Sequence, residues 1–152
     1  MLKFHALILK TISTVLLLSA LFFAGGCTTF NHDWKKAATQ TPPPDSMEGR
    51  WQGVWASDVT HHTDELRCVV TRKDDGTYRA RFHAKYHKVL SFGYTVPLKV
   101  EPATNGFHFS GEANLGWYAG GVYHYDGTAN ATNFLSTYSC KYDHGTFKMV
   151  RP

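Results

Sequence analysis

The sequence predicts an all-β domain, and three observations support this prediction. Beyond residue 46, no stretch carries apolar residues at the i, i+3, i+4, i+7 spacing of an amphipathic helix, whereas alternation with a period of two recurs. Gly, Pro, Asn and Asp interrupt the alternation at short, nearly even intervals. Eight or nine short strands of this kind fit an up-and-down barrel or a sandwich. Closure into a barrel is favoured because it leaves no edge strand exposed.

The clearest strand is expected over residues 77–88, after an Asp-Gly pair that favours a tight hairpin with residues 65–72. Apolar residues alternate there with basic ones, so one face should pack in the core and the other should be solvated. The basic face is also a candidate docking site for anionic lipid, lipopolysaccharide or an acidic partner, although any exterior strand must be polar. It consists of Arg79, Arg81, His83, Lys85, His87 and Lys88.

The remaining strands are expected between further turn signals. Val96-Pro97 and the Asn and Gly residues near 105 and 115 divide the pattern into short segments. The expected strands are residues 50–57, 89–96, 97–102, 106–113, 117–126, 131–140 and 145–151.

Residues 1–26 have the features of a signal peptide, with a basic start followed by an apolar run over residues 11–23. Small residues at 24–26 then stand directly before Cys27. This pattern resembles the lipobox of bacterial lipoproteins, which implies cleavage before Cys27 and lipidation of its thiol with acyl chains such as palmitate. Thr28 follows where inner-membrane lipoproteins often carry Asp, so the resemblance implies the outer membrane, with the protein facing the periplasm. A transmembrane anchor or an ordinary secretory signal is the alternative.

Residues 27–48 are expected to join the lipidated cysteine to the folded domain as a flexible tether. The stretch is polar and ends in a Pro-rich run, a composition that resists helix and sheet. Phe30 and Trp34 could instead dip into the membrane interface.

The net charge is weak evidence for a nucleic-acid partner, and none is expected. The chain has 16 Lys and Arg against 12 Asp and Glu, a net charge of +4. Lys3 and Lys10 lie in the leader, so its removal leaves 14 basic residues against 12 acidic ones.

Two cysteines remain if the lipid occupies Cys27. Cys68 and Cys140 are then an even pair in an oxidising compartment, which predicts a disulfide bond. The alternative is a nucleophilic Cys68 activated by His61 or His62. The bridge is favoured because Cys68 lies in an apolar run, where a reactive thiolate is costly.

The ends of the segment 49–152 carry a second resemblance. Gly49 and Trp51 open the first strand and Arg151 closes the last one. This looks like the Gly-x-Trp start and terminal Arg of the calycins, the lipocalin-like barrels. The resemblance implies a small antiparallel eight-stranded barrel in which the arginine lies across the tryptophan ring at the closed end, as a cation over an aromatic face.

The barrel segment is rich in aromatic residues, including all eight tyrosines of the chain. If most of them point inward, a large cavity is not expected. Four aromatic residues near the Gly120-Gly121 pair are candidate ligand-binding residues for a sugar ring or a lipid tail, the alternative being a bulge with core aromatics. They are Trp117, Tyr118, Tyr123 and Tyr125.

Catalytic and metal sites are not expected, and neither is a cofactor. His83 and His87 would lie about 13 Å apart on one strand, too far to share a metal. No spacing forces the carboxylates of Glu101, Glu112, Asp126 or Asp143 to face one another.

These features predict a lipid-anchored, non-catalytic binding module. Its ligand would be a small apolar molecule, a glycan, or a protein partner held in the manner of barrel-shaped inhibitors. A structural envelope lipoprotein without a small ligand is the alternative, and a hydrolase is the least favoured interpretation.

Overall fold

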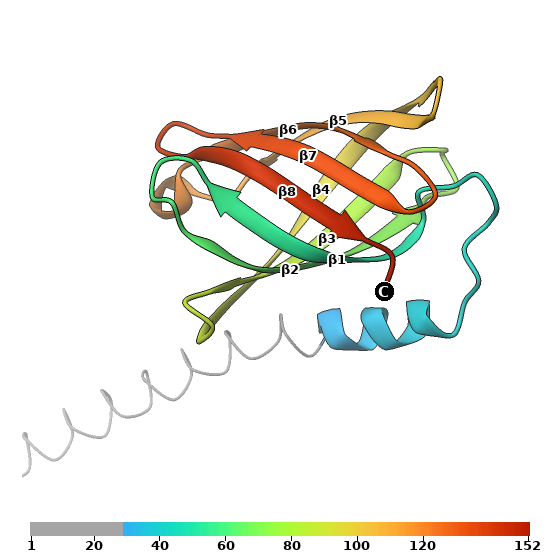
Figure 1. Ribbon diagram of the computed structural model, residues 1–152, viewed down its shortest axis with the longest axis horizontal. Coiled ribbons are helices and arrows are strands. Elements are labelled where there is room, and N and C mark those ends of the chain that lie inside the picture. The colour runs from blue at the N-terminus through green and yellow to red at the C-terminus, as the bar shows by residue number, and fades with distance from the viewer. Residues whose placement is uncertain (1–28) are drawn as a thin grey trace, which may run out of the picture.

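The computed structural model describes residues 29–152 and contains a closed barrel of eight antiparallel strands (Figure 1). Each strand pairs with its neighbours in sequence, and β1 pairs with β8 to close the barrel. This confirms the all-β class and the eight-stranded barrel, and it is consistent with a lipocalin-like fold. The elements are β1 Gly49–Ser57, β2 Thr63–Arg72, β3 Tyr78–Tyr86, β4 Leu90–Ala103, β5 Gly106–Asn114, the 3-10 helix η1 Trp117–Ala119, β6 Val122–Ala129, β7 Asn133–Ser139 and β8 His144–Val150.

Two predicted boundaries differ from the structure. β4 is one strand where two were expected, because it continues through Pro97 instead of ending there. Pro97 pairs with β3 alone, and the pairing with β5 begins at Leu98, so the missing N–H falls where β4 has one partner strand. The strand expected over 117–126 begins at Val122, because Gly120 and Gly121 have positive φ and form a turn.

One end of the barrel is closed by a packed core. The β2–β3, β4–β5 and β6–β7 turns lie at this end together with residues 38–48 and the C-terminus (Figure 1). The side chains of Trp51, Phe109 and Phe134 are fully buried there, and the last two rings lie 4.5 Å apart.

Arg151 covers this closed end. Its guanidinium lies 3.8 Å from the centre of the Trp51 ring. It also donates hydrogen bonds to the carbonyl oxygens of Ser46, at 2.9 Å, and of Glu48. Gly49 lies so close that a Cβ there would be 2.9 Å from the arginine Nη1. This is the arrangement of Gly49, Trp51 and Arg151 that the calycin resemblance implies.

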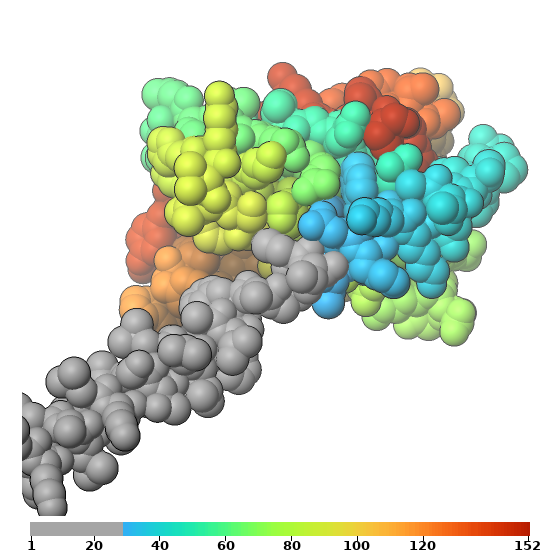
Figure 2. Space-filling view, turned by 90° about the horizontal axis from the view of Figure 1, so that it is seen from below, coloured from blue at the N-terminus to red at the C-terminus, as the bar shows by residue number. Residues whose placement is uncertain are grey.

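The stretch expected to be a tether without helix is helical over residues 29–38. This N-terminal helix lies on the outside of the barrel, where Figure 2 shows it in blue against the green surface of the strands. Phe30 is fully buried and stacks on His83 of β3, with ring centres 4.9 Å apart. Phe30 and Trp34 are four residues apart, so they share one helix face, and Arg67 of β2 lies 5.4 Å from each ring. The helix is therefore stabilised by packing on the barrel.

The basic outer face of β3 is consequently less solvated than expected. His83 is 5% exposed because Phe30 covers it. Arg81 forms an ion pair with Asp33 of the helix and donates a hydrogen bond to Thr29 Oγ1 at 2.5 Å. The helix thus occupies the middle of the face that was a candidate for docking.

The predicted disulfide is absent, and Cys68 and Cys140 are both free thiols. Cys68 lies mid-strand in β2 with its side chain fully buried in the core. Cys140 follows the end of β7 and is hydrogen-bonded to the Tyr123 hydroxyl. The two thiols sit at different depths in the barrel, and aromatic side chains fill the interior around Cys68.

The predicted signal peptide and the lipidation site Cys27 lie outside the described residues. Within residues 29–152, no helix combines the length and the apolar character needed to cross a membrane.

Candidate functional site: a cavity at the open end of the barrel

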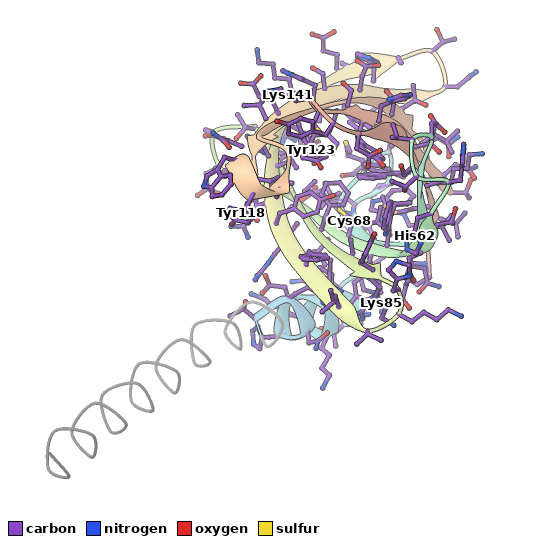
Figure 3. The ribbon with its side chains drawn as sticks, turned by 90° about the vertical axis from the view of Figure 1, so that its left-hand side faces the viewer. His62, Cys68, Lys85, Tyr118, Tyr123 and Lys141 are labelled. Carbon is purple, nitrogen blue, oxygen red and sulfur yellow. The ribbon has the colours of Figure 1, made fainter. Side chains whose placement is uncertain are left out.

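The end of the barrel opposite Trp51 contains a cavity of about 430 Å³. Figure 3 looks into this end, with Tyr118 and Tyr123 on one side of the opening and Lys85 and His62 on another. The lining is mainly apolar and aromatic. The expectation that aromatic side chains would leave no large cavity is therefore wrong for this half of the barrel.

Small residues explain the space. The inward face of β3 carries Phe82 near the middle of the barrel and Ala84 one step closer to the opening. Ala119 of η1 also lines the cavity, and its methyl group does not extend far into it. Large rings fill the closed half, whereas these positions leave the open half hollow.

The wall is also incomplete between β4 and β5. In the described chain, β4 pairs with β5 from Leu98 onward, while its first half, residues 90–97, pairs with β3 alone. Phe92 of β4 and Leu115 and Tyr118 of the β5–β6 connection line the cavity at this place. The opening therefore extends from the end of the barrel into its side.

Tyrosine hydroxyls provide hydrogen-bonding groups inside the apolar wall. Tyr94 is hydrogen-bonded to Tyr125, and Tyr138 donates to Asp143 Oδ2 at 3.0 Å. Burial, together with the neighbouring hydroxyl of Tyr125, raises the pKa of Tyr94 well above its usual value. Burial likewise raises the pKa of Tyr123, Tyr125 and Tyr138. These hydroxyls stay protonated at physiological pH and serve as neutral donors and acceptors.

The two charged residues of the lining already have partners. Asp143 accepts hydrogen bonds from Ser57, at 2.6 Å, and from Tyr138. Lys85 forms an ion pair with Glu65 at 2.8 Å. Neither group is left without a hydrogen-bond or ion-pair partner when a neutral molecule occupies the cavity.

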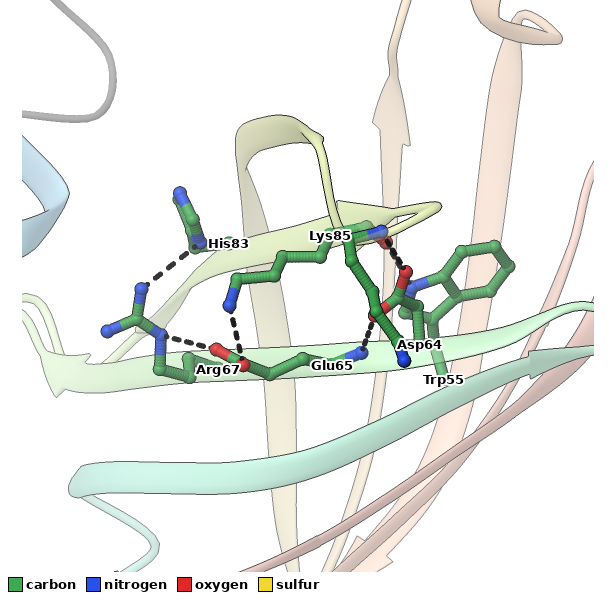
Figure 4. Close-up of polar contacts among 7 residues, drawn as sticks. Trp55, Asp64, Glu65, Arg67, His83 and Lys85 are labelled. Carbon is green, nitrogen blue, oxygen red and sulfur yellow. Dashed lines mark hydrogen bonds and ion pairs between the residues drawn. The ribbon is translucent and has the colours of Figure 1, made fainter.

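Polar contacts hold the β3–β4 hairpin at the rim of the cavity (Figure 4). Glu65 of β2 contacts both Arg67, at 3.3 Å, and Lys85. Trp55 Nε1 donates to the Lys85 carbonyl oxygen at 2.8 Å. Asp64 accepts hydrogen bonds from the backbone N–H groups of Glu65 and Lys88, which lower the pKa of its carboxyl group. Contacts with residues of β1 and β2 thus fix the position of the hairpin.

Three of the four predicted ligand-binding residues line the cavity. They are Tyr118, Tyr123 and Tyr125. Trp117 is outside the lining and 88% exposed, with its ring packed edge-on against Tyr118. Sequence analysis missed Tyr94 and Tyr138. For Tyr138 a signal existed, because residues 134, 136 and 138 alternate inward along β7.

The residues considered for metal binding or nucleophilic catalysis do not form such a site in the described chain. Among residues 29–152, no group of three or more His, Cys, Asp or Glu side chains could hold a metal ion. The exposed His108 pairs with Asp126 at 3.0 Å, and His124 pairs with Glu112 at 3.6 Å. Burial raises the pKa of the Cys68 thiol well above its usual value, which disfavours the nucleophilic thiolate.

Comparisons with known proteins found no match for this chain among protein-family models, curated proteins or solved structures. The cavity and its surroundings are therefore the basis for assigning a function.

Proposed function

We propose that this protein is a membrane-anchored lipoprotein that binds a small apolar ligand in the cavity at the open end of its barrel. The observation that carries the proposal is the cavity of about 430 Å³ with its mainly aromatic wall. Small-molecule sites typically have volumes of about 300–1,000 Å³ and combine apolar walls with a few polar groups.

The lining indicates the chemistry of the ligand. The wall is largely apolar, and its polar groups are chiefly tyrosine hydroxyls. A glycan would bury many hydroxyl groups, each of which needs a hydrogen-bond partner, and Asp143 and Lys85 are already engaged. A neutral molecule with an apolar body and one hydrogen-bonding group fits this lining better.

Binding is favoured over catalysis by the state of the candidate nucleophiles. The Cys68 thiol and the cavity tyrosines are all held in their protonated forms by burial. A nucleophile usually needs a lowered pKa or an adjacent base. These groups are instead suited to a passive, neutral binding site.

The anchor part of the proposal places the lipid on Cys27 and the barrel in the periplasm, on the outer membrane. The lipobox-like residues 24–27 support it. Metabolic labelling with palmitate should mark the wild-type protein, and the Cys27→Ala variant should carry no label. Labelling of the Cys27→Ala variant would contradict the proposal that Cys27 carries the lipid.

Ligand binding can be tested with 1-aminoanthracene, a neutral apolar fluorophore with one amino group. The purified protein should enhance its emission in a saturable way. Ala84→Trp should fill the cavity and weaken binding by roughly tenfold or more, a loss of at least ~1.4 kcal/mol.

The matched control is Leu135→Trp, which adds a ring on the outer, half-exposed face of β7. This variant should bind the probe as the wild type does. Equal binding by the Ala84→Trp and Leu135→Trp variants would exclude the cavity as the site. Absence of binding to the wild type would favour the structural envelope role.

A further inference from the structure

We propose that the rim of the cavity lies in the membrane surface, so that the ligand passes between the bilayer and the barrel without crossing water. The occupant of this surface is a lipid bilayer with anionic headgroups. The proposal rests on the Cys27 anchor of the proposed function, and it adds the orientation of the barrel and the route of the ligand.

The first observation is a cluster of exposed apolar side chains at the rim. Val89 is 84% exposed, Leu90 55% and Phe92 53%, all on the β3–β4 hairpin and the start of β4. Trp117 and Tyr118 of η1 are 88% and 80% exposed. Phe92 and Tyr118 line the same cavity, so the hairpin and η1 border one opening.

A patch of this kind marks an interaction surface. The hairpin is held in place by Asp64 and Trp55, so its exposed apolar tip is a fixed feature of the fold. Trp and Tyr rings prefer the boundary between water and hydrocarbon, because one edge is apolar and the other forms hydrogen bonds.

The second observation is the place where the chain leaves the described structure. Thr29 is hydrogen-bonded to Arg81 of β3 and Phe30 is buried beside His83, so the chain is fixed to the barrel from residue 29 onward. Cys27 precedes Thr29 by two residues, which can span at most about 7 Å. In the proposed function, the lipidated residue is therefore within this reach of Thr29, which contacts β3.

The direction of the helix decides which end of the barrel is near the lipid. Phe30 packs on His83 in the half of β3 that leads to the cavity. Ala37, near the other end of the helix, lies beside Gly49 and residues 69–71 at the closed end. The helix N-terminus thus points toward the open end, and a lipid on Cys27 brings the rim toward the bilayer.

Charge on this side is compatible with anionic headgroups. Lys88 is exposed on the hairpin, and Lys141 is exposed between β7 and β8 at the same end of the barrel. The carboxylates of this side are already paired: Asp33 with Arg81, Glu65 with Lys85 and Arg67, and Asp64 with backbone N–H groups. The hairpin thus presents the positive charge of Lys88 to anionic headgroups.

The test uses the full-length lipidated protein in phosphatidylethanolamine and phosphatidylglycerol vesicles whose acyl chains carry bromine, a quencher of tryptophan emission. Wild-type emission should be quenched relative to vesicles without bromine. The quenching should fall clearly in Trp117→Phe, a change at an exposed position that leaves the core intact. Trp51→Phe, at the buried closed end, is the matched control and should keep the quenching.

A second variant tests the role of the helix. Phe30→Ala should release the helix from β3, so the protein should still sediment with the vesicles while Trp117 escapes quenching. Sedimentation of the wild type without quenching of Trp117 would overturn the proposal, whereas palmitate labelling and 1-aminoanthracene binding, which test the proposed function, would be unaffected. A dimer that hides Trp117 from brominated lipid would also overturn it and would assign the rim to a second copy.

Discussion

The two ends of the barrel are built from the same eight strands but differ in what their inward side chains do. At the closed end, Trp51, Phe109 and Phe134 fill the interior, and Arg151 covers it. At the open end, Ala84 and tyrosine hydroxyls leave a cavity, and the rim exposes large apolar side chains. A few inward positions thus separate a packed half from a hollow half.

The largest expected effect is on the free energy of unfolding, when one tryptophan at each end of the barrel is replaced by alanine. Trp51→Ala should lower the free energy of unfolding by about 4 kcal/mol, because Trp51 is fully buried and its loss leaves a cavity under Arg151. Trp117→Ala should change it by no more than ~0.5 kcal/mol, since Trp117 is exposed. Urea denaturation measures both values. Similar losses for the two variants would contradict the division into two halves.

The next comparison places one substitution at two positions on the inward face of β3. Ala80→Leu should destabilise the protein by about 2 kcal/mol, because Ala80 is fully buried in the packed core. Ala84→Leu should cost ~0.5 kcal/mol or less, because its added atoms enter the cavity. Thermal unfolding gives the stabilities, and 1-aminoanthracene titration should show weaker binding for Ala84→Leu alone. Equal destabilisation by the two leucines would mean that the open half is packed in solution.

The smallest expected effect concerns the contact between the N-terminal helix and β3, where Phe30 stacks on His83. Burial beneath Phe30 lowers the pKa of His83 below its usual 6.5, and the nearby Arg67 contributes in the same direction. The unfolded chain then takes up a proton at a higher pH than the folded one. The stability from neutral His83 is therefore present above about pH 6.5 and is lost as the pH falls toward the folded pKa.

The measurement is the free energy of unfolding from about pH 7.5 down to about pH 5, which should fall through this window. His83→Gln removes the titrating group and should flatten this part of the profile. A wild-type profile that rises as the pH falls would contradict the buried, neutral His83.

The barrel could be predicted from sequence because period-two alternation and turn residues are local signals. Trp51 and Arg151 were identified from the resemblance to the calycins, in which residues of these types stand at the two ends of the folded segment. The N-terminal helix was missed because its ten residues, 29–38, are polar overall, and its apolar pair Phe30 and Trp34 is stabilised by β2 and β3, which lie far along the chain.

The cavity was missed for a related reason. Aromatic content predicts how much volume the side chains occupy, but where they leave space depends on which positions face one another across the barrel. Ala84 is in β3, and its position beside Tyr118 depends on the β5–β6 connection. The disulfide prediction failed because an even number of cysteines says nothing about their depth, and Cys68 is in the core while Cys140 is at a strand end.

Arg151 also has a consequence for how the chain folds. It donates to the carbonyl oxygen of Ser46, 105 positions earlier, and β8 must pair with β1 before the interior is sealed. The barrel therefore cannot close until β8 and Arg151 have been synthesised. Until then, Trp51 and the rings around it remain accessible, so the growing chain depends on slow, long-range pairing and is open to chaperones and proteases.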